Sequence, residues 1–424
     1  MNYVIIGNSA AAVGGIEGIR RVDREGLITI VGEEPYHVYG RPLISYLLEG
    51  KTDAERMKYR PGDFYEKNGC ELKKGVAAVK IDAKKKTVAL ENGEVMPYGR
   101  LLIATGARPF VPRIRGLEKY EYHTFMTLGD ALKLKAKTDA VKNAKVLIFG
   151  AGLIGLKCAE AIYKRVSEIT VVDMADRVLP SILDAESSAL IKAHLESRGI
   201  KFLLSADVSP DDFQFDILCV CTGVTPETAV AKDAGLEIGR GIFIDKNSRT
   251  GDPYIYAAGD CTESFSAVTG RRGVTPILPN AYIQGETAGI NMAGGSAEYD
   301  GAMPMNAIGF FGKHILTAGI YEGEEIKRGS FAAASASDLS SVSACTLKKL
   351  FVKDGGLKGF IFIDDFKRAG IYTALVRERR DISGLDADAL IENAGLNFYP
   401  KEFRDEVLKR RESRQGIYAG ENLL

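Results

Sequence analysis

The segment Gly150–Gly155 reads Gly-Ala-Gly-Leu-Ile-Gly and fits the pattern G-x-G-x-x-G. In a turn between a strand and a helix, the first glycine permits the tight bend and the second lets the backbone approach a pyrophosphate. The third glycine lets helix and strand pack closely, and the N-terminus of that helix attracts the phosphates. The pattern predicts a dinucleotide site formed by Gly150, Gly152, Leu153, Ile154 and Gly155.

Asp173 follows the next apolar strand, residues 169–172. An acid in this place accepts hydrogen bonds from the adenosine ribose and repels a 2′-phosphate. The sequence therefore favours NAD over NADP, although Arg177, one helical turn further on, would soften that preference.

A looser copy of the same pattern opens the chain, where Gly7-Asn8-Ser9-Ala10-Ala11-Ala12 reads G-x-S-x-A-A. Small residues at Ser9, Ala10 and Ala11 replace the glycines that allow close approach. Apolar strands at 2–6 and 27–31, with helical spacing between them, predict a parallel βαβ unit. The acid after the second strand is displaced, so Glu33 or Glu34 would reach a ribose.

Three further strands end in small polar turns. One runs into Ala104-Thr105-Gly106-Ala107-Arg108, and a second, in the other nucleotide fold, runs into Thr222-Gly223. The third, residues 254–258, ends on Gly259-Asp260, which places one carboxylate where a ligand hydroxyl needs an acceptor.

Length and composition set limits on the function. A chain of 424 residues suits two or three domains, and a formal net charge of zero gives no support for a nucleic-acid partner. The six cysteines show neither Cys-x-x-Cys nor zinc spacing, the four histidines do not cluster with acids, and we predict no metal site. We expect reduced cysteines, no signal peptide, no membrane span and a cytoplasmic protein.

In this order the motifs resemble those of flavoproteins with two dinucleotide-binding domains, the FAD- and NAD(P)H-dependent pyridine nucleotide-disulfide oxidoreductase superfamily. The resemblance covers about residues 1–325 well and the remainder more loosely. It implies that the first fold binds FAD, that Asp260 binds the ribityl chain, and that the second fold binds NAD(H). The FAD contacts that it implies are Gly7, Ser9, Ala10, Ala11, Glu33, Arg41, Pro42, Ala78, Ala104, Thr105, Gly106, Ala107, Arg108, Gly259, Asp260, Asn280 and Ala281.

The loop at residues 35–45 distinguishes among subfamilies. Disulfide reductases have a redox cysteine pair here, and NADH oxidases and coenzyme A-disulfide reductases have one cysteine, whereas this chain has none. The loop resembles those of rubredoxin and ferredoxin reductases, of the flavin region of nitrite reductases, and of flavoprotein subunits of anaerobic oxidoreductase complexes. That resemblance implies that Arg41 contacts the diphosphate or adenosine part of FAD.

Two positions depart from these relatives. Ferredoxin reductases usually have lysine where this chain has Tyr46, and glutamate where it has Lys157; the two residues commonly pair near the flavin and the nicotinamide. We hypothesise that Lys157 lies near that junction and favours the anionic reduced flavin. A solvent-facing lysine on a helix is the alternative.

The fold prediction is an α/β protein with two Rossmann-like domains, the NAD domain inserted in the FAD domain, and a C-terminal α+β interface domain. We assign residues 1–112 and 246–310 to FAD, 113–245 to NAD(H), and 311–424 to the interface domain. The interface domain contains a serine-rich stretch at 335–343 and a charged helical tail with a charge run at 409–412.

The predicted function is electron transfer between NAD(H) and an iron or iron–sulfur partner, by direct hydride transfer to flavin N5 without a redox cysteine. Rubredoxin, ferredoxin or a sibling subunit would be the partner, and the chain would form a homodimer or part of a larger complex. The alternatives are an NADH oxidase or disulfide reductase, and a flavin-bearing assembly subunit.

Overall fold

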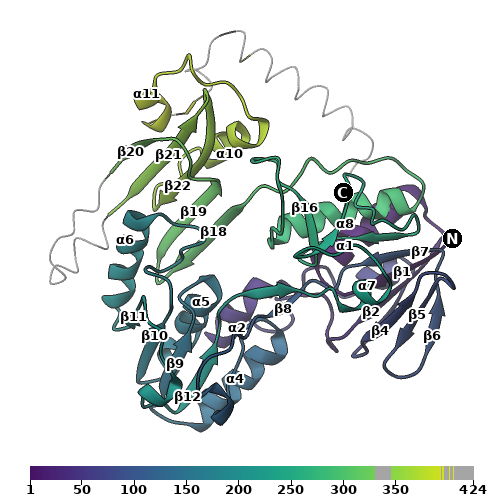
Figure 1. Ribbon diagram of the computed structural model, residues 1–424, viewed down its shortest axis with the longest axis horizontal. Coiled ribbons are helices and arrows are strands. Elements are labelled where there is room, and N and C mark those ends of the chain that lie inside the picture. The colour runs from purple at the N-terminus through teal and green to yellow at the C-terminus, as the bar shows by residue number, and fades with distance from the viewer. Residues whose placement is uncertain (330–344, 393, 396–400, 402–403, 405–424) are drawn as a thin grey trace. The chain divides into compact units, whose positions relative to one another are not determined.

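The computed structural model describes residues 1–329, 345–392, 394–395, 401 and 404 (Figure 1). The serine-rich stretch at 335–343 and the charge run at 409–412 lie outside these described residues.

A five-stranded parallel sheet with the order β15-β7-β1-β2-β3 forms the first nucleotide fold. Its strands are β1 (Asn2–Ile6), β2 (Leu27–Gly32), β3 (Cys70–Lys74), β7 (Arg100–Ile103) and β15 (Ile255–Ala257). The long helices α1 (Ala10–Val22) and α8 (Leu278–Met292) lie side by side against it (Figure 1). Strands β1 and β15 are almost fully buried, as apolar runs in a covered parallel sheet should be.

The stretch at 70–97 divides between two sheets. Strand β3 pairs in parallel with β2 and extends the main sheet, because its residues continue the register from Ile28 to Gly32. Only β4 (Ala78–Asp82), β5 (Thr87–Leu90) and β6 (Val95–Pro97) form the antiparallel meander.

A four-stranded parallel sheet with the order β11-β10-β9-β12 repeats the nucleotide fold. It consists of β9 (Lys145–Phe149), β10 (Glu168–Val172), β11 (Lys201–Leu203) and β12 (Ile217–Val220), with α4 (Leu128–Ala140), α5 (Leu153–Ile162) and α6 (Ala185–Glu196). Helix α5 begins at Leu153, inside the G-x-G-x-x-G turn, and a 3₁₀ turn at Tyr163–Arg165 follows it.

Two short antiparallel strands, β8 (Ala107–Pro109) and β13 (Val224–Pro226), join the two nucleotide folds. The smaller elements around them are α2 (Ile44–Leu48), α3 (Phe64–Lys67), α7 (Ala229–Asp233), β14 (Ile242–Phe243), β16 (Thr262–Phe265), β17 (Arg272–Gly273) and the 3₁₀ turns Arg41–Leu43, Leu117–Lys119 and Pro210–Asp212.

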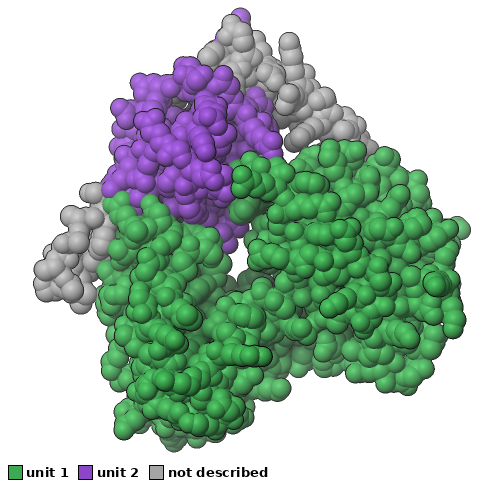
Figure 2. All heavy atoms as spheres, in the orientation of Figure 1, with its two compact units in different colours: residues 1–304, 309–312 green, residues 305–308, 313–424 purple. Residues whose placement is uncertain are grey.

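The chain divides into two compact units, residues 1–304 with 309–312 and residues 305–308 with 313–424 (Figure 2). The second unit is built on a sheet with the order β18-β19-β22-β21-β20. Its elements are β18 (Met305–Phe310), β19 (Lys313–Gly319), β20 (Glu324–Arg328), β21 (Leu347–Lys353), β22 (Gly356–Ile363), α10 (Ala369–Glu378) and α11 (Ala387–Glu392). The three domain boundaries expected from the sequence remain predictions.

In the part of the chain that the structure describes, no helix combines the length and the apolar character needed to cross a membrane.

Candidate cofactor sites

Helices α1 and α8 touch through their backbones. A Cβ on Gly285 would lie less than 3.0 Å from the carbonyl oxygen of Ala11, and one on Gly14 would lie equally close to that of Tyr282. Gly289 and Gly18 repeat the arrangement one turn further along. Close approach is possible only because these positions carry no side chain.

The strand end Gly259-Asp260 lies beside the N-terminal turns of these two helices. A Cβ on Gly259 would stand 3.1 Å from the Cβ of Ala11 and 3.4 Å from that of Ala281. The backbone at Gly259 has a φ of +86°, and its N–H donates to Gln284 Oε1 at 2.8 Å. Gln284 therefore anchors the turn that presents Asp260.

The Asp260 carboxylate receives no hydrogen bond from the residues that the structure describes, although the residue is half-buried. Burial raises the pKa of Asp260 to about 6, while the positive charge of Arg41 acts in the opposite direction. A carboxylate so placed lacks donors, and ligand hydroxyl groups would supply them.

Helices α1, α5 and α8 share a further property. Ser9, Gly152 and Ile277, the residues before α1, α5 and α8, make no side-chain hydrogen bond to the first turn. In contrast, Thr127 and Asp184 cap α4 and α6. The first-turn N–H groups of the three uncapped helices, except at Pro279, thus remain available to an anion such as a pyrophosphate. Those of α1 and α8, together with Asp260, fit the phosphates and the ribityl chain of FAD, and those of α5 fit the phosphates of a second dinucleotide.

The first glycine turn is packed against the neighbouring strand end. Gly7 has a φ of +112°, and a Cβ there would lie less than 3.0 Å from the Ala104 oxygen. Thr105 donates its hydroxyl to the Glu227 oxygen at 2.6 Å, and Gly106 faces open space. Arg108 is 64% exposed and pairs with Glu227 at 3.2 Å. The structure thus brings Gly7, Ala104 and Gly106 to one sheet edge.

The two acids after β2 have different surroundings. Glu34 accepts hydrogen bonds from Tyr39 Oη at 2.7 Å and from Arg41 Nη2 at 2.8 Å. Glu33 is exposed at the surface and makes no such contact with the described residues. Of the two, Glu33 is therefore the one available to a ribose.

Arg41 also donates to the Met126 oxygen at 3.3 Å, and Pro42 is the second residue of the 3₁₀ turn Arg41–Leu43. Ala78 begins β4, in a half-buried position. The Asn280 side chain donates to the Thr275 oxygen at 3.0 Å and accepts a hydrogen bond from Tyr299. A contribution of Asn280 to a ligand would thus come from its backbone.

The three glycines of the second glycine turn differ in the space around them, as the pattern predicts. A Cβ on Gly150 would lie less than 3.0 Å from the Cys221 oxygen, and one on Gly155 would be as close to the Gly150 oxygen. A Cβ on Gly152 would meet nothing within 4 Å. Gly150 and Gly155 serve internal packing, while the open space at Gly152 suits a ligand that approaches the backbone.

Asp173 is fixed under this turn. Its Oδ2 accepts the Ala151 N–H at 2.6 Å and its Oδ1 accepts the Ala175 N–H at 2.8 Å. Arg177 pairs with Asp176 at 2.8 Å. On the adjoining strand end, Gly223 faces open space and Thr222 donates its hydroxyl to the Phe110 oxygen at 2.6 Å. Gly152, Asp173 and Gly223 thus line one end of the second sheet.

Lys157 lies on α5 directly after this turn. Its side chain is 16% exposed and forms an ion pair with Glu160, so it does not face solvent. The ammonium also lies 5.3 Å from the centre of the Tyr46 ring. The two positions that depart from ferredoxin reductases are therefore in contact, as a cation–π pair.

Cys261 and Cys70 are not activated thiols. Burial raises the pKa of Cys261, next to Asp260, to about 11, and its thiol donates to the Ala258 oxygen at 3.3 Å. Burial likewise raises the pKa of Cys70 to about 11. Because the thiolate is the reactive species, these cysteines are poor redox groups at neutral pH. Among the described residues, no three His, Cys, Asp or Glu side chains gather in a way that could hold a metal ion.

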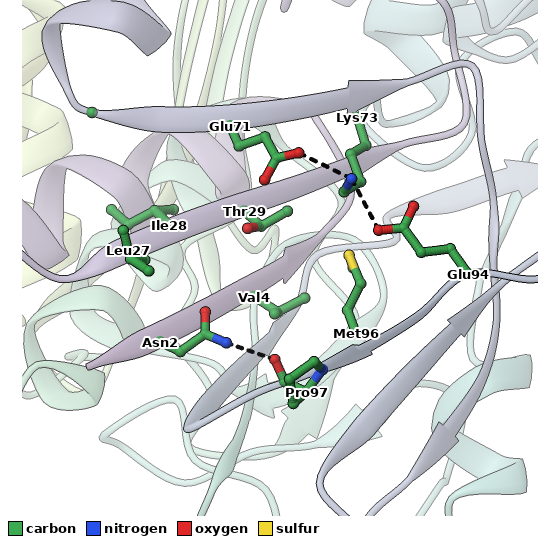
Figure 3. A pocket seen from close by; sticks show the side chains of 11 residues that line it. Asn2, Val4, Leu27, Ile28, Thr29, Glu71, Lys73, Glu94, Met96 and Pro97 are labelled. Carbon is green, nitrogen blue, oxygen red and sulfur yellow. Dashed lines mark hydrogen bonds and ion pairs between the residues drawn. The ribbon is translucent and has the colours of Figure 1, made fainter.

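A separate pocket of about 280 Å³ lies beside β1, β2 and β3, where Lys73 is held between Glu71 and Glu94 (Figure 3). None of the predicted cofactor-binding residues lines it.

Sequence reasoning did not select Glu160 or the helix-contact glycines as site residues. The glycines had a visible signal, since Gly14 and Gly18 on one expected helix and Gly285 and Gly289 on the other share the four-residue spacing of one helix face. The role of Glu160 depends on a partner 151 positions away and had no such signal.

The family model and the related proteins that match this chain agree on one family. Residues 1–285 match the family model described as pyridine nucleotide-disulphide oxidoreductase. Subunit epsilon of the NADH-dependent phenylglyoxylate dehydrogenase of Aromatoleum evansii is 32% identical over 403 residues, which cover 90% of this chain and 93% of the relative. Rubredoxin-NAD(+) reductase of Pseudomonas putida is 29% identical over 313 residues, which cover 70% of this chain and 81% of the relative.

Solved structures show the same architecture. An NAD-dependent persulfide reductase from A. fulgidus superposes with a TM-score of 0.81 at 28% identity, covering 91% of this chain and 78% of its own. NADH:rubredoxin oxidoreductase from Clostridium acetobutylicum superposes with a TM-score of 0.75 over 92% of this chain and 99% of its own; at 22% identity it supports the fold alone. The predicted α/β class with Rossmann-like sheets is confirmed. The chain belongs to the pyridine nucleotide-disulphide oxidoreductase family and is an FAD- and NAD(P)H-dependent oxidoreductase.

Proposed function

We propose that this chain transfers electrons between NAD(H) and an iron or iron–sulfur protein through FAD, without a cysteine relay. The observation that carries the proposal is the loop at 35–45, which has no cysteine, together with the raised thiol pKa values of Cys70 and Cys261. When bound, FAD accepts two electrons from the nicotinamide as a hydride at N5 and can release them one at a time.

The residues of the chain would bind the two dinucleotides and orient them. The uncapped N-termini of α1 and α8 would face the diphosphate and the flavin ring, and Asp260 would accept hydrogen bonds from ribityl hydroxyls. Glu33 would bind the adenosine ribose of FAD. The Gly150–Gly155 turn and Thr222-Gly223 would hold the second dinucleotide in line with the first, and alignment itself lowers the barrier to transfer.

We propose NAD rather than NADP as the nucleotide. The supporting observation is Asp173, which two backbone N–H groups hold in place at 2.6 and 2.8 Å. The fixed charge would accept the ribose hydroxyls and repel a 2′-phosphate. Arg177, which would bind such a phosphate, is paired with Asp176.

The oxidation of one NADH releases two electrons and one proton, so two one-electron iron acceptors balance each turnover. A rubredoxin, a ferredoxin or a sibling subunit in the cytoplasm is the proposed partner. Support comes from relatives that are named rubredoxin-NAD(+) reductase and probable ferredoxin reductase.

The proposal is tested with the FAD-loaded chain, NADH and either rubredoxin or a two-iron ferredoxin. We expect reduction of at least one iron protein at a rate well above that with oxygen or a disulfide. Turnover with oxygen or coenzyme A disulfide alone would contradict the proposal and favour the NADH oxidase or disulfide reductase alternative, for which a Methanocaldococcus jannaschii relative named NADH oxidase gives a precedent.

A second candidate is a flavoprotein subunit of a larger oxidoreductase. The specific observation is that the relative covered over 93% of its length is named as a subunit of a dehydrogenase. Stoichiometric co-purification with iron–sulfur subunits, and slow turnover by the isolated chain, would favour this reading over that of a free-standing reductase or a homodimer.

A further inference from the structure

Lys157 is a nearly buried ammonium group with four neighbours. Its Nζ pairs with Glu160, donates to the Gly309 oxygen at 3.2 Å, and lies 5.3 Å and 5.5 Å from the ring centres of Tyr46 and Phe310. These neighbours come from three segments that are far apart in the sequence: α5, α2 and the turn at 309–312.

Glu160 completes the arrangement from the next turn of α5. Its side chain is 8% exposed, one oxygen pairs with Lys157, and the other accepts the Phe311 N–H at 2.6 Å. A buried ion pair offsets its desolvation only when its remaining hydrogen bonds are made, as they are here. Because the two charges cancel, the pair exerts little net field on a neighbouring ring.

The turn that this pair holds is strained. Phe311 has a φ of +49°, an uncommon backbone conformation for a bulky residue. Three more contacts hold the turn: Lys157 on Gly309, His194 Nε2 at 3.1 Å from the Phe310 oxygen, and the Tyr163 ring edge-on to Phe311 at 4.9 Å. A strained turn persists only where its surroundings enforce it.

Helix α2 is the third segment. It begins at Ile44, at the end of the 35–45 loop, and carries Tyr46, whose ring lies 5.3 Å from the ammonium. Arg165, just after α5, donates to the Leu48 oxygen at 2.9 Å and so fixes the other end of α2.

We infer that Lys157 and Glu160 form a neutral, buried positioning pair that locks the NAD-binding helix α5 to the flavin-loop helix α2 and to the 309–312 turn. The pair thereby sets how closely the nicotinamide approaches the flavin, rather than stabilising charge on the reduced ring. The inference rests on the proposed hydride transfer between the two dinucleotides.

The test compares Lys157→Met and the double variant Lys157→Met/Glu160→Gln with the wild-type chain. Lys157→Met leaves a buried carboxylate without its cation and should lower thermal stability. The double variant removes both charges and should recover much of that loss, because no buried charge is left unpaired. Lys192→Met, which breaks the exposed pair with Glu196, is the matched control.

Three measurements separate positioning from a charge effect. In the double variant, backbone amides at 309–312 should exchange with deuterium faster, with or without FAD. Anaerobic flavin reduction by NADH should slow by about tenfold to a hundredfold, since small misplacements have effects of that size. The flavin midpoint potential should stay at the wild-type value. An unchanged reduction rate, or a shift in potential that accounts for the slower rate, would overturn the inference.

A second pair of variants carries the test if the double variant does not retain FAD. Tyr46→Phe keeps a ring beside the ammonium and should behave as wild type, whereas Tyr46→Ala should slow reduction several-fold. Equal rates for the two would reject the inference. If the FAD-loaded wild-type chain is reduced by neither NADH nor NADPH, the proposed function itself fails, and the inference with it.

Discussion

The carbonyl oxygen of Ala11 occupies the space into which a Cβ on Gly285 would project. This contact lets α1 and α8 pack backbone to backbone, with Gly259 and Asp260 beside their first turns. The geometry of the proposed FAD site therefore depends on a residue that is not expected to touch the cofactor.

Gly285→Ala should weaken FAD binding by forcing these helices apart. Overpacking of this kind costs about 1–3 kcal/mol, and we expect a loss of that size in the free energy of unfolding. Denaturant unfolding and flavin titration of the apoprotein would measure both effects. Gly251→Ala, where a Cβ meets nothing within 4 Å, is the control. Normal stability and FAD affinity in Gly285→Ala would refute the role of this contact.

Gly152→Ala should separate ligand approach from folding. A Cβ there meets no protein atom within 4 Å, so the melting temperature should not change. A pyrophosphate lying against the turn would meet the methyl group, and the Kd for NADH should rise at least about tenfold, or about 1.4 kcal/mol. Gly150→Ala, which clashes with the Cys221 oxygen, should instead destabilise the fold. Unaltered NADH binding by Gly152→Ala would place the nucleotide elsewhere.

Asp173→Asn should reduce the preference for NADH over NADPH. The variant loses the charge that accepts ribose hydrogen bonds, and interactions of this kind contribute about 1.5–3 kcal/mol, roughly 10- to 100-fold in kcat/KM. Steady-state kinetics with both nucleotides would give the ratio, with the exposed Asp207→Asn as control. A ratio equal to that of the wild type would show that Asp173 does not contact the ribose.

Asp260→Asn should stabilise the chain without FAD at neutral pH. Burial raises the pKa of Asp260 from an ordinary value of 3.8 to about 6. Between these values the folded chain binds more protons than the unfolded chain, so its stability falls as the pH rises through this window and stays lowered above it.

The Asn variant lacks this loss. Above pH 6, the free energy of unfolding of its apoprotein should therefore be higher than that of the wild type by at most about 3 kcal/mol. The difference should vanish below about pH 4. Denaturant unfolding across this pH range would measure it, again with Asp207→Asn as control. A difference that does not depend on pH would contradict the assigned pKa.

The glycine turns and strand ends could be predicted because their chemistry is local. Gly150, Gly152 and Gly155 lie within six residues, and each glycine meets the surroundings that the pattern requires. The strand ending at Asp260 and the helices after both turns follow from the same short-range signals.

Contacts between distant residues could not be predicted in this way. The pattern did not show that Glu34 accepts a hydrogen bond from Arg41, because this contact depends on how the 35–45 loop folds back. It also did not show that β3 joins the main sheet, since an edge strand of five residues looks the same in a meander. For Lys157, the sequence offered a flavin charge or a solvent-facing lysine, because its contacts with Gly309 and Phe310 join segments more than 150 positions apart.

Anaerobic rapid mixing of the FAD-loaded chain with NADH, before and after alkylation of its accessible thiols, tests the central claim most directly. We predict that the visible absorbance of the flavin bleaches in a single turnover, at the same rate in both samples, because no thiol takes part. No bleaching, or a rate abolished by alkylation while FAD stays bound, would contradict direct transfer from the nicotinamide to the flavin.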